Sequence, residues 1–270
     1  MKKKLLSGIA GIIFISASII ACQPESNETS TANQRIATTS EFNFDLVGEA
    51  HNNCLAYIAA HPNFDDLTAE ERYNYGLTYS DPNFDTPDMS FEEAVEHFNS
   101  AINMAEALIN SRTPLGNMLY ESGHITESMI PYVDAVFQPH IDMADNGYMI
   151  EPSEYYAIIG DIKAEIIESF PIVYDEIDQT AYEGIILLSL CSVAEYSYEY
   201  WYYEKDVPMS STMGDSNLLL TFKNLIDQVT DPIMLVKEAT PYSTGASHIS
   251  DIKNIKAIMA AFGSAYTGYE

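Results

Sequence analysis

Basic residues are scarce in this 270-residue chain. It has 12 Lys and Arg against 40 Asp and Glu, so its formal net charge at pH 7 is −28. Between Tyr73 and Ile162 the only basic residue is Arg112. Because phosphate contacts rely on Lys and Arg, this balance argues strongly against a nucleic-acid partner and against a domain that lies flat on anionic lipid. A uniformly acidic surface is typical of a well-solvated exported protein, although it can also attract cations or basic partners.

Cysteines and catalytic motifs are also few. The chain has three cysteines and no CxxC or Cys/His spacing of a zinc site. Cys54 and Cys191 both lie in apolar helical patterns, which leaves open a disulfide between them or two buried free thiols. There is no GxSxG nucleophile elbow, and no two histidines are spaced as HxxxH. A catalytic site would therefore have to be assembled from residues that are distant in the sequence.

The N-terminus has the layout of a secretory leader. A basic start at Lys2–Lys4 precedes the apolar run Leu5–Ala21, which is too short and wrongly flanked for a stable membrane span. The run ends in "IIAC", which resembles the lipobox of bacterial lipoproteins. The resemblance implies that residues 1–21 are a signal peptide and that Cys22 is acylated, so that lipid holds the protein on a membrane. Gln23 after the cysteine implies outer-membrane sorting if the cell is Gram-negative.

The rest of the chain divides into a tether and a domain. Residues 22–42 are polar and lack apolar periodicity, so we expect a lipidated, flexible tether. Residues 43–270 form helix after helix, with no period-2 alternation bounded by hairpin turns. We predict an all-α domain, an irregular bundle of about seven or eight helices. The expected helices cover 45–61, 67–79, 90–111, 124–147 (broken or kinked near Pro131 or Pro139), 152–170, 180–204, 216–229 and 250–262.

One stretch matches a calcium-loop pattern. Its candidate ligands stand at positions 1, 3, 5 and 12 of an EF-hand loop, and they are Asp81, Asn83, Asp85 and Glu92. Position 6 should be glycine because the loop turns sharply there, but this chain has Thr86, a β-branched residue that tolerates positive φ badly. We expect no cofactor, and this spacing leaves calcium as the one alternative.

A repeat within that stretch favours a structural interpretation. "PNFD" occurs at 62–65 and again at 82–85, each time ahead of a helix that begins with a capping box. The first copy has His61 at position 1 and Arg72 at position 12, so it cannot bind calcium. The shared element is a proline turn with a Phe to fix it. We therefore expect a helix entrance at both copies, with calcium binding at the second as the alternative.

Two further segments are candidates for a binding role. "EYSYEYWYYE" at 195–204 is either an aromatic platform for a sugar or peptide, or a belt of rings running from core to surface.

"VGEAHNNCLAYI" at 47–58 resembles the opening G-x-x-H-N-x-x-L helix of an uncharacterised group of exported proteins, often lipoproteins, of Bacteroidota. The resemblance extends to "EPSEYYAIIGDI" and to 185–201. It implies a shared all-α domain and no activity, and it singles out His51 and Asn52, which we expect to fix the first helix through buried hydrogen bonds.

Together these features predict a lipid-anchored protein of the cell envelope, most simply a non-enzymatic one. Its partners would be the membrane, through the N-terminal lipid, and an unidentified protein or glycan. One alternative is a surface module that binds calcium or carbohydrate. The second alternative is an envelope hydrolase with a dispersed active site.

Overall fold

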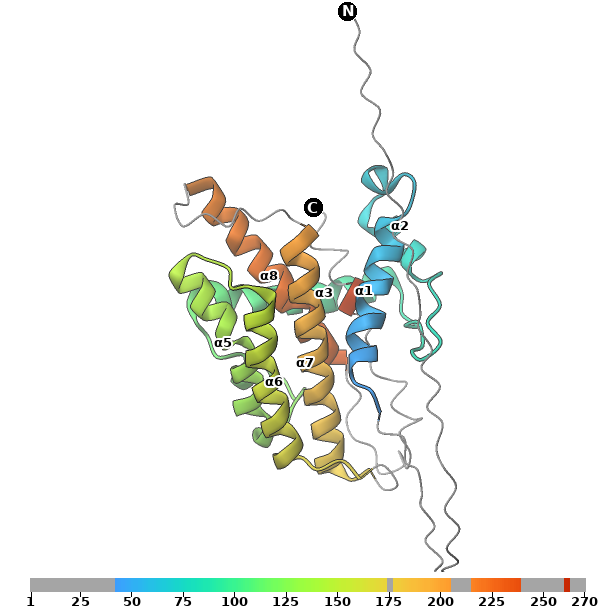
Figure 1. Ribbon diagram of the computed structural model, residues 1–270. Helices are drawn as coiled ribbons and strands as arrows, with labels where there is room; N and C mark the ends of the chain where they lie inside the picture. Colours follow the sequence, from blue (N-terminus) through green and yellow to red (C-terminus); the bar gives the residue numbers. More distant parts are fainter. Residues whose placement is uncertain (1–41, 174–176, 205–214, 239–259, 263–270) are drawn as a thin grey trace, which may run out of the picture. The chain divides into compact units, whose positions relative to one another are not determined.

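The computed structural model describes residues 42–173, 177–204, 215–238 and 260–262. These residues form α-helices and two short 3-10 helices, and none of them lies in a β-strand, so the all-α prediction is confirmed (Figure 1). The bounds are α1 Asp45–Ala59, η1 Phe64–Asp66, α2 Ala69–Gly76, α3 Phe91–Ser111, α4 Leu115–Glu121, η2 Glu127–Met129, α5 Ile130–Asn146, α6 Pro152–Ser169, α7 Gln179–Glu204 and α8 Asp215–Glu238.

The predicted leader, residues 1–21 with the lipidation site Cys22, lies outside the described residues. Within the described helices, none combines the length and the apolar character that crossing a membrane requires.

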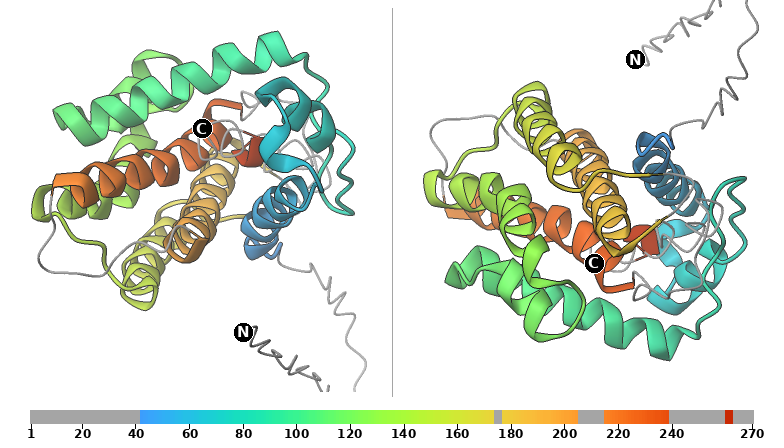
Figure 2. Two further views of the ribbon diagram at one scale, coloured as in Figure 1. Left: turned by 90° about the horizontal axis from the view of Figure 1, so that it is seen from above. Right: turned by 90° about the horizontal axis from the view of Figure 1, so that it is seen from below.

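Helix α7 occupies the centre of the domain, as its apolar sequence predicts. It packs against α1, α6 and α8, and α8 packs in turn against α3. Seen along its axis, α7 has α1 on one side and α6 on the other, while α8 lies between α3 and α7 (Figure 2). The segment from Ile185 to Ala194 is buried throughout, which explains why no polar face is visible in that part of the sequence.

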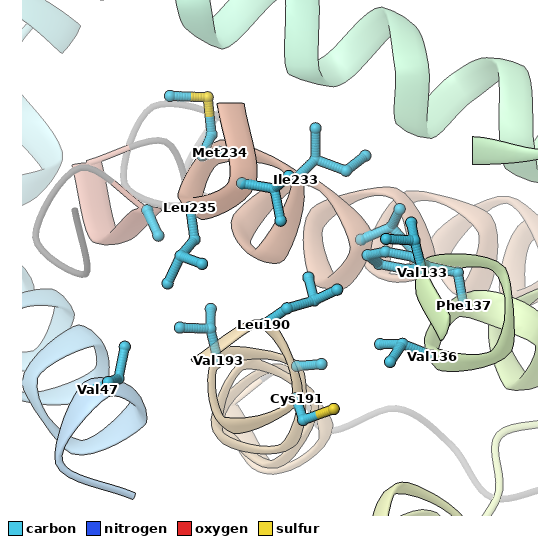
Figure 3. Close-up of a cluster of buried hydrophobic side chains, with 14 of the residues drawn as sticks. Val47, Val133, Val136, Phe137, Leu190, Cys191, Val193, Ile233, Met234 and Leu235 are labelled. Atoms are coloured by element: carbon cyan, nitrogen blue, oxygen red, sulfur yellow. The ribbon is translucent and has the colours of Figure 1, made fainter. Parts of the chain in front are cut away.

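Apolar side chains from four helices meet around α7. Val193 of α7 points toward Leu235 of α8, while Leu190 points toward the side on which Val133 of α5 lies, and Val47 of α1 lies on the opposite side (Figure 3). All five side chains are fully buried or nearly so. Burying such residues is the main favourable term in folding, about 25 cal/mol for each Å² of apolar surface removed from water.

Helices α2 and α3 each begin with a capping box, as the sequence predicts. The side chain of Thr68 accepts from the backbone N–H of Glu71, whose carboxylate accepts in return from the backbone of Thr68. Ser90 and Glu93 repeat this reciprocal capping box at the start of α3. Each box satisfies two backbone donors that a helix start leaves unpaired.

Three differences from the sequence-based prediction are larger than the small shifts at the other helix ends. The short helix α4 lies between the expected helices 90–111 and 124–147, where no helix was predicted. Helix α5 begins at Ile130 with Pro131 in its first turn, six residues later than expected, and it continues through Pro139. Helix α8 continues through Pro232 to Glu238 instead of ending near Val229. The predicted helix at 250–262 lies outside the described residues except for one turn at 260–262.

Candidate functional site

Helix α1 approaches α7 closely at Gly48. A Cβ atom at this position would lie 2.3 Å from Cδ2 of Tyr196 and 2.8 Å from the carbonyl oxygen of Ser192. The backbone N–H of Gly48 donates to the hydroxyl of Ser192 at 3.0 Å. The Ser192 hydroxyl of α7 thus satisfies a backbone donor in the first turn of α1. A residue larger than glycine at position 48 would keep the two helices further apart.

His51 and Asn52 lie one turn further along the same contact. The imidazole of His51 is fully buried, and its Nδ1 donates to Oδ1 of Asn52 at 2.9 Å. The amide of Asn52 donates to the backbone carbonyl of Tyr196 at 3.0 Å. Asn52 therefore joins α1 to α7, and His51 holds the Asn52 amide from within α1, as expected of a structural role.

Asp231 of α8 is the centre of this polar cluster. Its side chain has 0 % exposure, and its Oδ2 accepts from the Ser197 hydroxyl at 2.5 Å and from the Trp201 indole N–H at 3.2 Å. Nε2 of His51 lies 3.4 Å from the same oxygen. The other carboxylate oxygen, Oδ1, has no hydrogen-bond partner among the described residues. Asp231 was not identified from the sequence, and the segment that contains Ser197 and Trp201 was singled out only for its aromatic rings, because nothing local to each residue points to the other two.

The cluster contains the residue types of a hydrolytic triad but not its arrangement. In a triad the imidazole stands between the hydroxyl and the carboxylate, so that it can take the hydroxyl proton. Here the carboxylate of Asp231 stands between Ser197 and His51, and the serine donates to it. All three side chains are buried. The arrangement is that of a hydrogen-bond network that holds three helices together, and it builds no nucleophile–base pair.

The residues of the calcium pattern stabilise a turn. Oδ1 of Asp81 accepts from the backbone N–H groups of Asn83 and Phe84 at 2.7 and 3.2 Å, and Tyr79 donates to Oδ2. Phe84 is buried. The hydroxyl of Thr86 donates to the carbonyl of Tyr79 at 2.9 Å. Asp81, which precedes "PNFD", thus closes an Asx-type turn ahead of α3, whose own N-cap is Ser90.

The remaining candidate ligands do not form a group with Asp81. Asn83, Asp85 and Glu92 are exposed, and Glu92 lies in the first turn of α3. Across the described part of the chain, no three His, Cys, Asp or Glu side chains are placed so that they could hold a metal ion. Calcium binding at this loop stays a prediction.

The tyrosine-rich segment mostly faces inward. Tyr198 and Trp201 are fully buried and Tyr202 nearly so, while Tyr196 and Tyr200 are half-buried. A sugar platform needs exposed ring faces, so the segment has the character of a belt that runs from the core to the surface.

A second buried cluster, which sequence reasoning missed, lies where α5, α6 and α7 meet. The rings of Tyr155 and Tyr198 stack with centroids 4.1 Å apart, and His140 lies edge-on to Tyr155 at 5.5 Å. Neither ring nitrogen of His140 has a hydrogen-bond partner among the described residues. Burial lowers the pKa of His140 to about 3, so the imidazole is neutral in the folded protein at neutral pH.

The two cysteines of the helical domain are free thiols. Cys54 and Cys191 are both buried, so of the two alternatives from the sequence the structure has the unbridged one. Burial raises the pKa of Cys191 to about 12 and also raises the pKa of Cys54. Since the thiolate is the reactive form, neither is poised for nucleophilic chemistry.

A hollow with a volume of about 430 Å³ lies between α5 and α6. Its walls carry apolar side chains together with two exposed carboxylates, those of Asp142 and Glu154. It is open to solvent, in contrast to the buried cluster around Asp231.

Comparison of the chain with protein-family models, with curated proteins and with solved structures finds no match in any of the three. The resemblance to exported Bacteroidota proteins therefore stays a prediction that depends on the sequence motifs alone.

Proposed function

We propose that this is a lipid-anchored protein of the bacterial cell envelope, with a helical domain that has a binding or structural role. The observation that carries the proposal is the leader: a basic start, an apolar run and "IIAC" before Cys22 and a polar tether. Membrane attachment then requires no spanning helix, because acyl chains contribute about 0.8 kcal/mol for each buried CH₂.

The polar cluster supports a non-enzymatic role for the domain. The buried His51, Ser197 and Asp231 connect helices and form no nucleophile–base pair. The partner in the envelope would be a protein or a glycan that binds at the exposed surface.

Lipid labelling of the full chain in a Gram-negative host tests the anchor. We expect the wild type to incorporate a labelled fatty acid and to sediment with the outer membrane, and the Cys22→Ser variant to lose both properties. Cys54→Ser and Cys191→Ser are the matched controls, because both thiols are buried in the domain and should leave labelling unchanged. A Cys22→Ser variant that still carries label would refute the anchor.

The calcium-binding alternative depends on the spacing of Asp81, Asn83, Asp85 and Glu92. It requires that millimolar CaCl₂ raise the melting temperature more than MgCl₂ does, and that Asp81→Asn with Glu92→Gln abolish the difference. Equal melting curves in the two salts would remove this alternative.

A further inference from the structure

The hollow between α5 and α6 combines an apolar floor with an acidic rim. The chain leaves α5 at Gly147, whose φ of 69° turns the backbone toward Tyr148, and it enters α6 at Pro152. The two helices and this connection form the walls of the hollow, which is open to solvent on one side. Its lining consists of Ala135, Gln138, Pro139, Asp142, Met143, Tyr148, Ile150, Glu154, Ile158 and Ile162.

Contacts with the buried aromatic cluster fix the inner wall. The hydroxyl of Tyr198 donates to the carbonyl of Ile150 at 2.6 Å and lies 3.4 Å from the sulfur of Met143. The backbone N–H of Ile150 also points to that sulfur, at 3.5 Å. Tyr198 itself is held by stacking on Tyr155. The hollow is therefore a preformed feature of the fold, as small-molecule sites usually are.

The negative charge at the rim has no counter-charge in the described structure. Of the described residues, no Lys or Arg lines the hollow. The nearest basic residues along the chain are engaged elsewhere, since Arg112 pairs with Asp145 and Lys163 pairs with Glu195. Asp142 accepts a hydrogen bond at 2.7 Å from Gln138, which is a neutral donor.

We propose that this hollow binds a small organic cation, an ammonium group attached to an apolar body. The ammonium group would lie between the carboxylates of Asp142 and Glu154, and the apolar body would cover Ile158 and Ile162. Tyr148, which is 52 % exposed, offers its ring at the mouth for a cation–π contact. The proposal concerns only α5 and α6 and does not depend on the lipid anchor.

Size and charge select this class of ligand. A volume of about 430 Å³ falls within the range of roughly 300–1,000 Å³ found for small-molecule sites. An anion would be repelled by two carboxylates and by a chain of net charge −28. A neutral apolar ligand would leave those carboxylates without a partner and would gain nothing from them.

Three probes of the same shape separate charge from apolar contact: 4-phenylbutylamine, 4-phenylbutanol and 4-phenylbutanoate. Binding to the purified full chain in nonionic detergent is followed by ligand-observed NMR. We expect the amine to bind with a Kd below about 1 mM, and the alcohol and the carboxylate to bind at least about tenfold more weakly. Raising the NaCl concentration should weaken binding of the amine.

The double variant D142N/E154Q should lose about tenfold in affinity for the amine while keeping the helical circular dichroism of the wild type and melting at no lower a temperature. The matched control is E106Q/E121Q, which removes two exposed carboxylates from α3 and α4 and should bind the amine normally. Equal binding of alcohol and amine would overturn the proposal. So would undiminished binding of the amine to D142N/E154Q, or no binding of the amine to the wild type at millimolar concentration.

Discussion

A single carboxylate, that of Asp231, accepts the hydrogen bonds of side chains from a neighbouring helix in a fully buried setting. The Ser197 hydroxyl and the Trp201 indole both donate to Oδ2, and His51 of a third helix lies beside the same oxygen. In a medium of low dielectric constant such bonds are stronger than in water, and an unpaired donor is correspondingly costly. His51 could be proposed from a sequence motif, but Asp231 could not, since it immediately precedes Pro232 and so has the local signature of a helix end.

Removal of the Asp231 side chain should therefore destabilise the domain. In Asp231→Ala the buried donors of Ser197 and Trp201 lose their acceptor, at a cost of about 1–3 kcal/mol each. Asp231→Asn keeps one acceptor oxygen and nearly the same volume, so its cost should be smaller. Asp161→Ala removes the same groups from an exposed position and should change the free energy of unfolding by less than about 0.5 kcal/mol. Urea unfolding followed by circular dichroism measures all three. An Asp231→Ala variant as stable as Asp161→Ala would contradict the role assigned to the carboxylate.

The buried imidazole of His140 should make stability depend on pH. Its pKa is lowered from 6.5 to about 3 in the folded protein, so the unfolded chain binds more protons between these values. The contribution to the free energy of unfolding is fully present above pH 6.5, and it decreases by about 1.4 kcal/mol for each pH unit as the pH falls toward 3.

The variant His140→Leu removes this proton uptake and leaves the carboxylates in place. As the pH falls from 6 to 4, the free energy of unfolding of this variant should decrease less steeply than that of the wild type. The difference in slope should be about that of one bound proton. Urea unfolding at several pH values gives both slopes, and the carboxylates contribute equally to each. Parallel curves would show that His140 is not buried in its neutral form.

At the scale of helices, local chemistry was enough to predict some elements and not others. Helix α3 begins one residue after the capping Ser90, as the capping box predicts. Helix α4 has no such signal, and a Gly lies in its first turn. It forms because Leu115 and Leu119 are buried and because the backbone N–H of Gly116 donates to Asp134 of α5 at 2.7 Å. These contacts come from a neighbouring helix, so the sequence of the segment alone does not contain them.

Two glycines in helices offer a test of close helix packing. Gly48→Ala would place a Cβ against the Tyr196 ring and the Ser192 carbonyl, and the backbone atom cannot move without displacing α7. We expect a loss of about 1–3 kcal/mol in the free energy of unfolding. Gly160→Ala in α6 meets no atom within 4 Å, so it should stabilise the helix by about 0.5–1 kcal/mol. Chemical denaturation measures the change in the free energy of unfolding for each variant. A Gly48→Ala variant at least as stable as the wild type would mean that α1 does not approach α7 as closely as the structure has it.

At the scale of the whole molecule, the dominant feature is negative charge with little to neutralise it. Lys163 of α6 pairs with Glu195 of α7 and lies 3.7 Å from Asp45 of α1, so one basic residue connects three helices. Most other acidic side chains of the described helices are exposed. The sequence predicts this surface directly, because charge counts do not depend on the fold. It does not predict which acidic residue is buried, as Asp231 shows.

A net charge of −28 should make the folded protein less stable in low salt, because like charges repel one another more strongly in the compact state. Raising NaCl from 10 mM to 0.5 M shortens the screening length from about 30 Å to about 4 Å, so the melting temperature should rise by several degrees. Charge reversal at two exposed positions of α6, Glu165→Lys with Glu168→Lys, should raise the low-salt melting temperature and reduce its rise with salt. The neutral pair Glu165→Gln with Glu168→Gln should fall between this variant and the wild type. Scanning calorimetry gives the three salt series. If the variants and the wild type gain equally from salt, the effect comes from the salt's action on apolar hydration and self-repulsion does not limit stability.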